Sequence, residues 1–298
     1  MNSGLRKQTV GDFIFNITNI FVMALIAFST IYPFWYVLVI SFNSGIDTLK
    51  GGVYFFPRVW TLENYYVVFK QKEILQGFQI SILRTIIGTI VSVFFTAMVA
   101  YAISKKELYM RKLYVTLGTI TMYFGGGLIP TFILISKWLG MGNKFIVYII
   151  PPMFSFWGVV IFQGFFREIP SSLEESAKID GANELYIFYK IVIPIAKPAL
   201  ATMALFSGVG HWNSWFDNYL YVTSPKLQTL SLYLYKTVNQ FSVRGKSEFE
   251  SFLGSSVSVT QLSVQCATIF VAIFPIIMIY PFLQKYFVKG IMIGSVKG

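Results

Sequence analysis

Six long apolar stretches, separated by polar segments, constrain the fold of this chain more than any other feature. Each is long enough for a helix to cross the hydrocarbon core of a bilayer, which takes about 20 residues. Charged residues make up 12% of the chain, about half the share in a soluble domain. The sequence therefore predicts an all-α, polytopic membrane protein, with residues 1–298 as a single transmembrane domain. Its six expected spans are about 13–42, 78–104, 113–136, 145–166, 194–216 and 264–288.

The first stretch and a short basic loop set the expected orientation. Residues 13–42 number 30 and are broken only by Pro33, which is too long for a signal-peptide core, so we expect a retained span. The loop at 105–112 carries four cations and one acid. Short basic loops stay on the cytoplasmic side of a membrane. The sequence therefore predicts that this loop and both termini are cytoplasmic.

Residues 170–198 form a long polar and amphipathic interruption in the middle of the chain. Ser171 and Ser172 are each followed three residues later by a glutamate, so either can form a capping box at a helix start. Gly181 offers the left-handed conformation that ends a helix. We expect a pair of helices at about 172–192 that turns at Gly181 and lies outside the bilayer. Such a corner is typical of a docking surface.

The order Glu175-Ser176-Ala177, two further residues, then Asp180-Gly181-Ala182 resembles the EAA motif of the membrane subunits of ABC importers. Ser176 stands where the motif usually has alanine. Phe188 and Pro194 follow as further positions of that motif. The whole stretch, including Leu173, Ile179 and Pro198, resembles the carbohydrate-uptake branch, of which the second maltose permease is a member. The tail 289–298 and the Trp212-Asn213 segment are similar to the same branch. Residues 123–130 resemble its members that import complex oligosaccharides.

This resemblance implies a non-catalytic permease subunit of an ATP-driven oligosaccharide importer in the bacterial cytoplasmic membrane. It implies that this chain binds no cofactor, and that a separate ATPase holds ATP and Mg. The expected partners are a second, homologous permease, an ABC ATPase dimer, an extracytoplasmic sugar-binding protein, the oligosaccharide and the lipid bilayer, without nucleic acid. The residues expected to dock the ATPase are Glu174, Glu175, Ser176, Ala177, Asp180, Gly181, Ala182, Phe188, Pro194, Lys297 and Gly298.

Sugar passage would use aromatic faces and polar hydrogen-bonding groups inside the bundle. Arg84 lies within the second stretch, where it marks a polar pathway or a buried pair, or else extends to the outer headgroups. The other candidates are Tyr123, Trp157, Gln163, Trp212 and Asn213. The alternative for several of them is packing, and for Trp212 a place in the aromatic belt at the membrane interface.

The charge of the loops bears on the substrate. The expected outer loops hold ten cationic and six acidic residues. Together with Arg84, this permits an acidic oligosaccharide, such as a pectin or alginate fragment. Basic loops also suit docking of an acidic binding protein. The alternatives are a neutral oligosaccharide, or a permease for amino acids or peptides.

Glycines interrupt the third stretch. Gly125-Gly126-Gly127 and Pro130 disfavour a regular helix there. Non-helical backbone at membrane depth is tolerated only against protein or water. We therefore expect this segment to face the interior of the bundle, with a packing kink as the alternative.

Several other kinds of site are excluded or disfavoured. Cys266 is the only cysteine and His211 the only histidine, so neither an intrachain disulfide nor a histidine-based metal site is expected. Gly245-Lys246-Ser247 ends like a phosphate-binding loop, but Gln240 stands where its first glycine belongs, so nucleotide binding is rejected. The net charge of +11 comes from scattered cations, which fits a membrane protein better than a nucleic-acid binder. A membrane enzyme would need a cluster of carboxylates or histidines at one interface.

Overall fold

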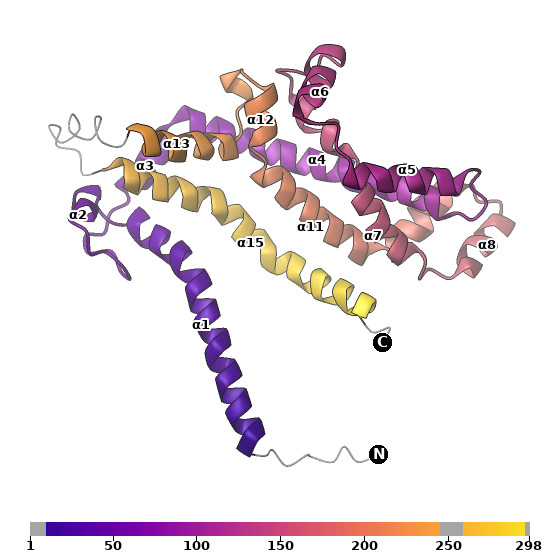
Figure 1. The fold of residues 1–298 in the computed structure, drawn as a ribbon, viewed down its shortest axis with the longest axis horizontal. Helices are drawn as coiled ribbons and strands as arrows, with labels where there is room; N and C mark the ends of the chain where they lie inside the picture. Colours follow the sequence, from indigo (N-terminus) through magenta and orange to yellow (C-terminus); the bar gives the residue numbers. More distant parts are fainter. Residues whose placement is uncertain (1–9, 245–258, 296–298) are drawn as a thin grey trace. The chain divides into compact units, whose positions relative to one another are not determined.

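The computed structural model describes residues 10–244 and 259–295, and the regular elements in these ranges are helices (Figure 1). Three of the described helices are long and apolar enough to cross a membrane, and there are up to six crossings if each of three bent helix pairs forms one span. The all-α membrane architecture predicted from the sequence is therefore confirmed. The chain divides into two compact units, Met1–Lys70 with Lys246–Val271 and Gln71–Gly245 with Ala272–Gly298.

Buried amide side chains organise the first unit. Asn64 Nδ2 donates hydrogen bonds to the carbonyl oxygens of Ser41 and Asn43, both at 2.9 Å, and Ser263 Oγ donates to Asn64 Oδ1 at 2.8 Å. A hydrogen bond from the Asn43 amide also holds the pKa of the Asp47 carboxyl below its ordinary value. These bonds join the ends of three helices within the unit. Its helices are α1 (Val10–Ser41), α2 (Gly45–Leu49), α3 (Glu63–Lys70) and the first part of α15 (Gln261–Ser295).

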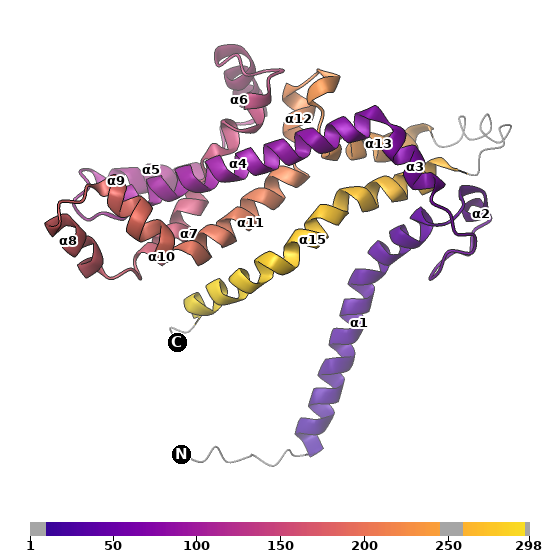
Figure 2. The same ribbon diagram turned by 180° about the vertical axis from the view of Figure 1, so that it is seen from behind.

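The second unit is built around α4 (Lys72–Ser104), which packs against α7 (Phe156–Phe166), α11 (Lys197–Asn213) and α13 (Leu230–Arg244). Figure 2 shows α11 running beside α4, with α8, α9 and α10 gathered at one end of α4. The largest apolar core lies where α4, α7, α9 and α11 meet. The other helices of this unit are α5 (Arg111–Tyr123), α6 (Leu128–Ile133), α8 (Ser171–Ile179), α9 (Glu184–Ile187), α10 (Ile193–Ile195) and α12 (Phe216–Tyr221).

The third expected span is broken at the three glycines, as the sequence predicted. α5 ends at Tyr123, Gly127 has a φ of +80°, and the helices on either side meet at 111°. The expectation that this segment faces the bundle interior is wrong for the chain by itself, since the side chain of Tyr123 is 78% exposed. The sharp bend is the reason, because it turns α6 away from the helices that pack on α4 (Figure 1).

Small residues allow α4 and α11 to approach each other closely. A Cβ atom on Gly88 of α4 would lie 2.4 Å from Cε1 of His211, whose side chain is buried. A Cβ atom on Gly208 of α11 would lie 3.4 Å from Thr89 Oγ1. Helices in membranes associate mainly through such close packing of small residues. His211 therefore occupies a packing position against α4.

Gly88→Leu is expected to destabilise the protein by about 1–3 kcal/mol, the usual cost of overpacking a close-packed interface. The reason is that the new side chain and the His211 ring need the same space. The melting temperature of the purified protein in detergent measures the effect. His211→Ala in the same chain should restore most of the loss. Gly164→Leu is the matched control, because no neighbouring atom of the described residues lies within 4 Å of its Cβ position.

Candidate docking surface and membrane path

The polar segment at 170–198 folds into a corner of two helices. α8 covers Ser171–Ile179, and Gly181 follows with a φ of +82°, as the sequence predicted. Asn183 begins α9, and its Oδ1 accepts a hydrogen bond from the backbone nitrogen of Tyr186 at 2.8 Å. The predicted capping box is wrong, because the residue at the N-cap position is Pro170 and no side chain caps α8. Glu174, which would complete one such box, pairs instead with Lys105, the residue after α4.

The EAA-like residues divide between two faces of this corner. Phe188 is buried in the apolar core, and Ala177 and Ala182 pack against that core. Five others are exposed: Glu175, Ser176, Asp180, Gly181 and Pro194. The buried group anchors the corner to the bundle, while the exposed group is free to meet another protein. The structure thus brings nine of the eleven expected docking residues to one corner, and Lys297 and Gly298 lie outside the described residues.

An apolar surface that the sequence analysis did not assign to docking borders the exposed group. Ile179 is 87% exposed, next to the Asp180-Gly181 turn. Leu173, Leu185 and Tyr186 are exposed on the same two helices. Several exposed large apolar residues together usually mark a binding site for another molecule.

Lys105, the residue after α4, lies between two acids of the corner. Its Nζ forms an ion pair with Glu174, and it lies 3.5 Å from Glu184 Oε2. Glu184 also accepts a hydrogen bond from the Tyr101 hydroxyl at 2.9 Å and pairs with Lys178 Nζ at 2.7 Å. We call these five residues the Lys105 network. It links the end of α4 to both helices of the corner, a role that the sequence analysis did not find.

Arg84 lies in a closed polar cluster and is 1% exposed. Its Nη2 is 2.5 Å from Asp217 Oδ2, and its Nη1 donates to the carbonyl oxygen of Ser214 at 3.0 Å. The guanidinium also lies over the ring of Tyr148, 4.5 Å from its centroid. Of the alternatives weighed for Arg84, the structure supports the buried pair. Extension to the outer headgroups is wrong, because the side chain turns into the protein.

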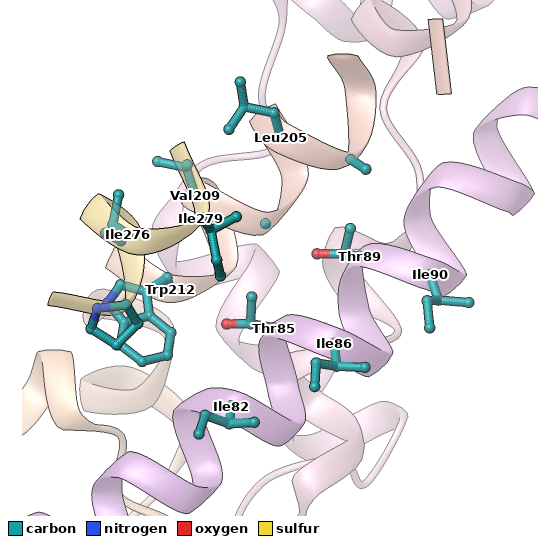
Figure 3. Close-up of a pocket in the computed structure, with 13 residues that line it drawn as sticks. Ile82, Thr85, Ile86, Thr89, Ile90, Leu205, Val209, Trp212, Ile276 and Ile279 are labelled. Carbon is teal, nitrogen blue, oxygen red and sulfur yellow. The ribbon is translucent and has the colours of Figure 1, made fainter. Parts of the chain in front are cut away.

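A cavity of about 470 Å³ lies between α4, α11 and the second part of α15. Its lining is apolar except for Trp212 and two threonine hydroxyls (Figure 3). Thr85 Oγ1 and Thr89 Oγ1 are buried and have no hydrogen-bond partner among the described residues. The indole nitrogen of Trp212 donates to the carbonyl oxygen of Ala272 at 3.0 Å. Trp212 thus combines a packing role with a place in the cavity wall.

The remaining substrate-path candidates do not gather at one place. Trp157 packs edge-to-face against Phe206, with ring centroids 5.5 Å apart. Gln163 is buried in α7, and its Nε2 has no partner among the described residues. Tyr123 and Asn213 are exposed. Within the described ranges, no cluster of histidine, cysteine, aspartate and glutamate could hold a metal ion. The Gly245-Lys246-Ser247 segment lies outside those ranges.

Comparison with known proteins identifies the class. No family model matches the chain. It is 36% identical to Protein LplC of Bacillus subtilis (strain 168), over 96% of this chain and 95% of that protein. It is also 36% identical to the polygalacturonan/rhamnogalacturonan transport system permease protein YtcP of the same bacterium, over 93% of this chain and 96% of that protein. The fold also matches a chain in the crystal structure of a bacterial ABC transporter involved in the import of the acidic polysaccharide alginate. The TM-score is 0.88 and the identity 31%, over 95% of this chain and 99% of that chain.

The fold and these relatives define a permease of an ABC transporter, a membrane protein built of apolar helices. The chain belongs to the family of ABC sugar transport permeases. The resemblance found in the sequence is therefore confirmed. The EAA motif and the corner that carries it are typical of this family.

Proposed function

We propose that this chain is one of two homologous membrane subunits of an oligosaccharide importer and that the exposed face of the α8–α9 corner docks an ABC ATPase dimer. The observation that carries the proposal is the division of the EAA-like residues: Ala177, Ala182 and Phe188 anchor the corner, whereas Glu175 and Gly181 are exposed. ATP would then act as a ligand that favours one of two arrangements of the helices. In this proposal the chain itself catalyses no reaction, and ATP and Mg stay on the partner.

The proposed setting is the bacterial cytoplasmic membrane, with both termini and the α8–α9 corner on the cytoplasmic side. The basic loop at 105–112 supports this orientation, since short loops rich in lysine and arginine stay inside. Its first residue, Lys105, contacts Glu174 of α8, so the loop and the corner lie on one side of the bundle. An extracytoplasmic binding protein would deliver the sugar from the opposite side.

For the substrate we propose an acidic oligosaccharide of the pectin or alginate type. Two relatives support this, since YtcP is named for polygalacturonan and rhamnogalacturonan, and the solved transporter imports alginate. The excess of cations in the expected outer loops agrees with it. Arg84 adds no support, because Asp217 already neutralises its charge.

The test is ATP hydrolysis by the complete complex reconstituted in lipid, titrated with oligosaccharides and the binding protein. We expect oligogalacturonates or oligoalginates to stimulate hydrolysis at least tenfold more than neutral oligosaccharides of the same length. Stimulation by neutral sugars alone would keep the importer and exclude the acidic substrate. Failure of the chain to purify with any ABC ATPase would exclude the proposed docking.

A further inference from the structure

We propose that Arg84 and Asp217 form a latch that holds residues 214–231 on α4 throughout the transport cycle. We call residues 214–231 the α12 corner, because they include α12 and the turns around it. Arg84 is in this view a positioning residue for transport and does not contact the sugar. The expected effect on transport rests on the proposed function. The attachment of residues 214–231 to α4 can be tested without transport, by the stability of the purified protein.

The latch joins three segments that are distant in the sequence. Arg84 of α4 contacts Asp217 of α12 and the carbonyl oxygen of Ser214, which ends α11. Its guanidinium also covers the ring of Tyr148, whose hydroxyl donates to the carbonyl oxygen of Leu227 at 2.7 Å. An arginine with its charge paired on one side and an aromatic face on the other is held in one orientation. The α12 corner is thereby attached to α4 at both of its ends.

Asp217 has little capacity left for another partner. Its Oδ1 accepts hydrogen bonds from Ser214 Oγ at 2.8 Å, from the backbone nitrogen of Asn218 at 2.8 Å and from Arg84 at 3.3 Å. Its Oδ2 receives the 2.5 Å contact from Arg84 Nη2. A buried charge pair is stable only when such additional hydrogen bonds satisfy its remaining atoms. Both terminal nitrogens of the guanidinium are thus engaged and not available to a carboxylate of a passing sugar, while its buried Nε has no hydrogen-bond partner among the described residues.

A stripe along α4 receives the rest of the α12 corner. Gly77, Ser81 and Arg84 are buried and follow each other at spacings of four and three residues, which places them on one face. Ser81 Oγ accepts a hydrogen bond from the backbone nitrogen of Leu230 at 3.0 Å. A Cβ atom on Gly77 would lie 3.1 Å from that same nitrogen. The stripe thus combines close approach, a hydrogen bond and an ion pair, as expected of two elements that move together.

A second layer ties the α12 corner to itself. Asn218 Oδ1 accepts hydrogen bonds from the backbone nitrogen of Thr229 at 2.7 Å and from its hydroxyl at 3.0 Å. Ser231 Oγ donates to the carbonyl oxygen of Ser214 at 2.9 Å, the same oxygen that Arg84 contacts. These bonds make the α12 corner one body, so the contacts that Arg84 and Ser81 make with it hold all of it on α4. The α12 corner is therefore expected to follow α4 as one body.

The test is a double-mutant cycle in the reconstituted complex, with uptake of an acidic and a neutral oligosaccharide as readouts. Arg84→Asp and Asp217→Arg each bring two like charges together, whereas the two changes together recreate an ion pair with its ends exchanged, and Asp217→Asn removes the charge of the acid alone. We expect each single change to lower the maximal transport rate at least tenfold for both sugars, with the half-saturating concentration unchanged. The double variant should return to within about threefold of the wild type.

Other outcomes overturn the proposal. If Asp217→Asn tightens binding of the acidic sugar only, Arg84 is a substrate contact. If the single changes have no effect, or if the double variant is as impaired as either single one, the pair is not a latch. If the wild type transports no sugar, the proposed function fails. The latch is then tested by the melting temperatures of the same purified variants, because a latch requires that the double variant recovers the stability that each single change loses. The pair Arg58–Asp47, in which the arginine side chain is 45% exposed, serves as control, with Arg58→Met expected to change neither readout.

Discussion

Gly181→Phe should reduce copurification of the permease with its ATPase at least tenfold, while the protein still inserts into the membrane. Gly181 has a φ of +82° and is exposed at the turn between α8 and α9. No atom of the described chain lies within 4 Å of its Cβ position, so a ring there would project toward the docked partner. A left-handed conformation also costs a residue with a side chain about 1–2 kcal/mol. The amount of ATPase bound per permease after purification measures the effect.

Two further variants distinguish a steric block of ATPase docking by a large side chain from general misfolding of the permease. Gly181→Asn keeps the left-handed turn, which asparagine tolerates, and adds a smaller side chain, so we expect an intermediate loss of ATPase. Gly140→Phe is the matched control, because Gly140 has a φ of +57° and equally free space but lies far along the chain from α8. Equal loss with Gly140→Phe would contradict a specific role for Gly181 in docking.

The features that could be predicted from the sequence are those that local composition determines. The apolar runs predicted the long helices α1, α4 and α15, because a continuous apolar run of that length suits a helix that crosses a bilayer. The interruption at 125–127 follows from the conformational freedom of glycine. The α8–α9 corner was predicted because its turn glycine and its Asn183 cap are local signals.

The partners of charged side chains could not be predicted, because they depend on contacts between distant segments. Asp217, the partner of Arg84, lies 133 residues further along the chain. Nothing near either residue in the sequence distinguishes that pairing from others, and the interpretation of Arg84 therefore kept several alternatives. Lys105 was assigned only to the orientation of the membrane protein, although Glu174 contacts it across 69 residues. One signal was present, since Gly77, Ser81, Arg84 and Gly88 repeat at the spacing of a packed helix face.

Lys105→Glu should uncouple ATP hydrolysis from transport. The change places three carboxylates together, because Glu174 and Glu184 already lie beside Lys105. Each partly exposed ion pair contributes only about 0–1 kcal/mol to stability, so the protein should still fold and bind its ATPase. The Lys105 network, however, joins α4 to the docking corner, and without it movement of the corner would reach α4 only through apolar packing. We expect at least a tenfold fall in sugar transported per ATP hydrolysed.

Charge reversal tests whether the contact itself is responsible. Glu174→Lys combined with Lys105→Glu recreates an ion pair between the same positions, so it should recover at least half of the coupling. Lys106→Glu introduces the same charge change one residue away at an exposed position and should leave the ratio unchanged. If the combined variant stays uncoupled, or if Lys106→Glu is equally impaired, the loop acts through its total charge. If the Lys105→Glu protein no longer binds the ATPase, Lys105 belongs to the docking surface. The Lys105 network would then be needed to present Glu175 and Gly181 to the ATPase, and not to transmit movement of the corner to α4.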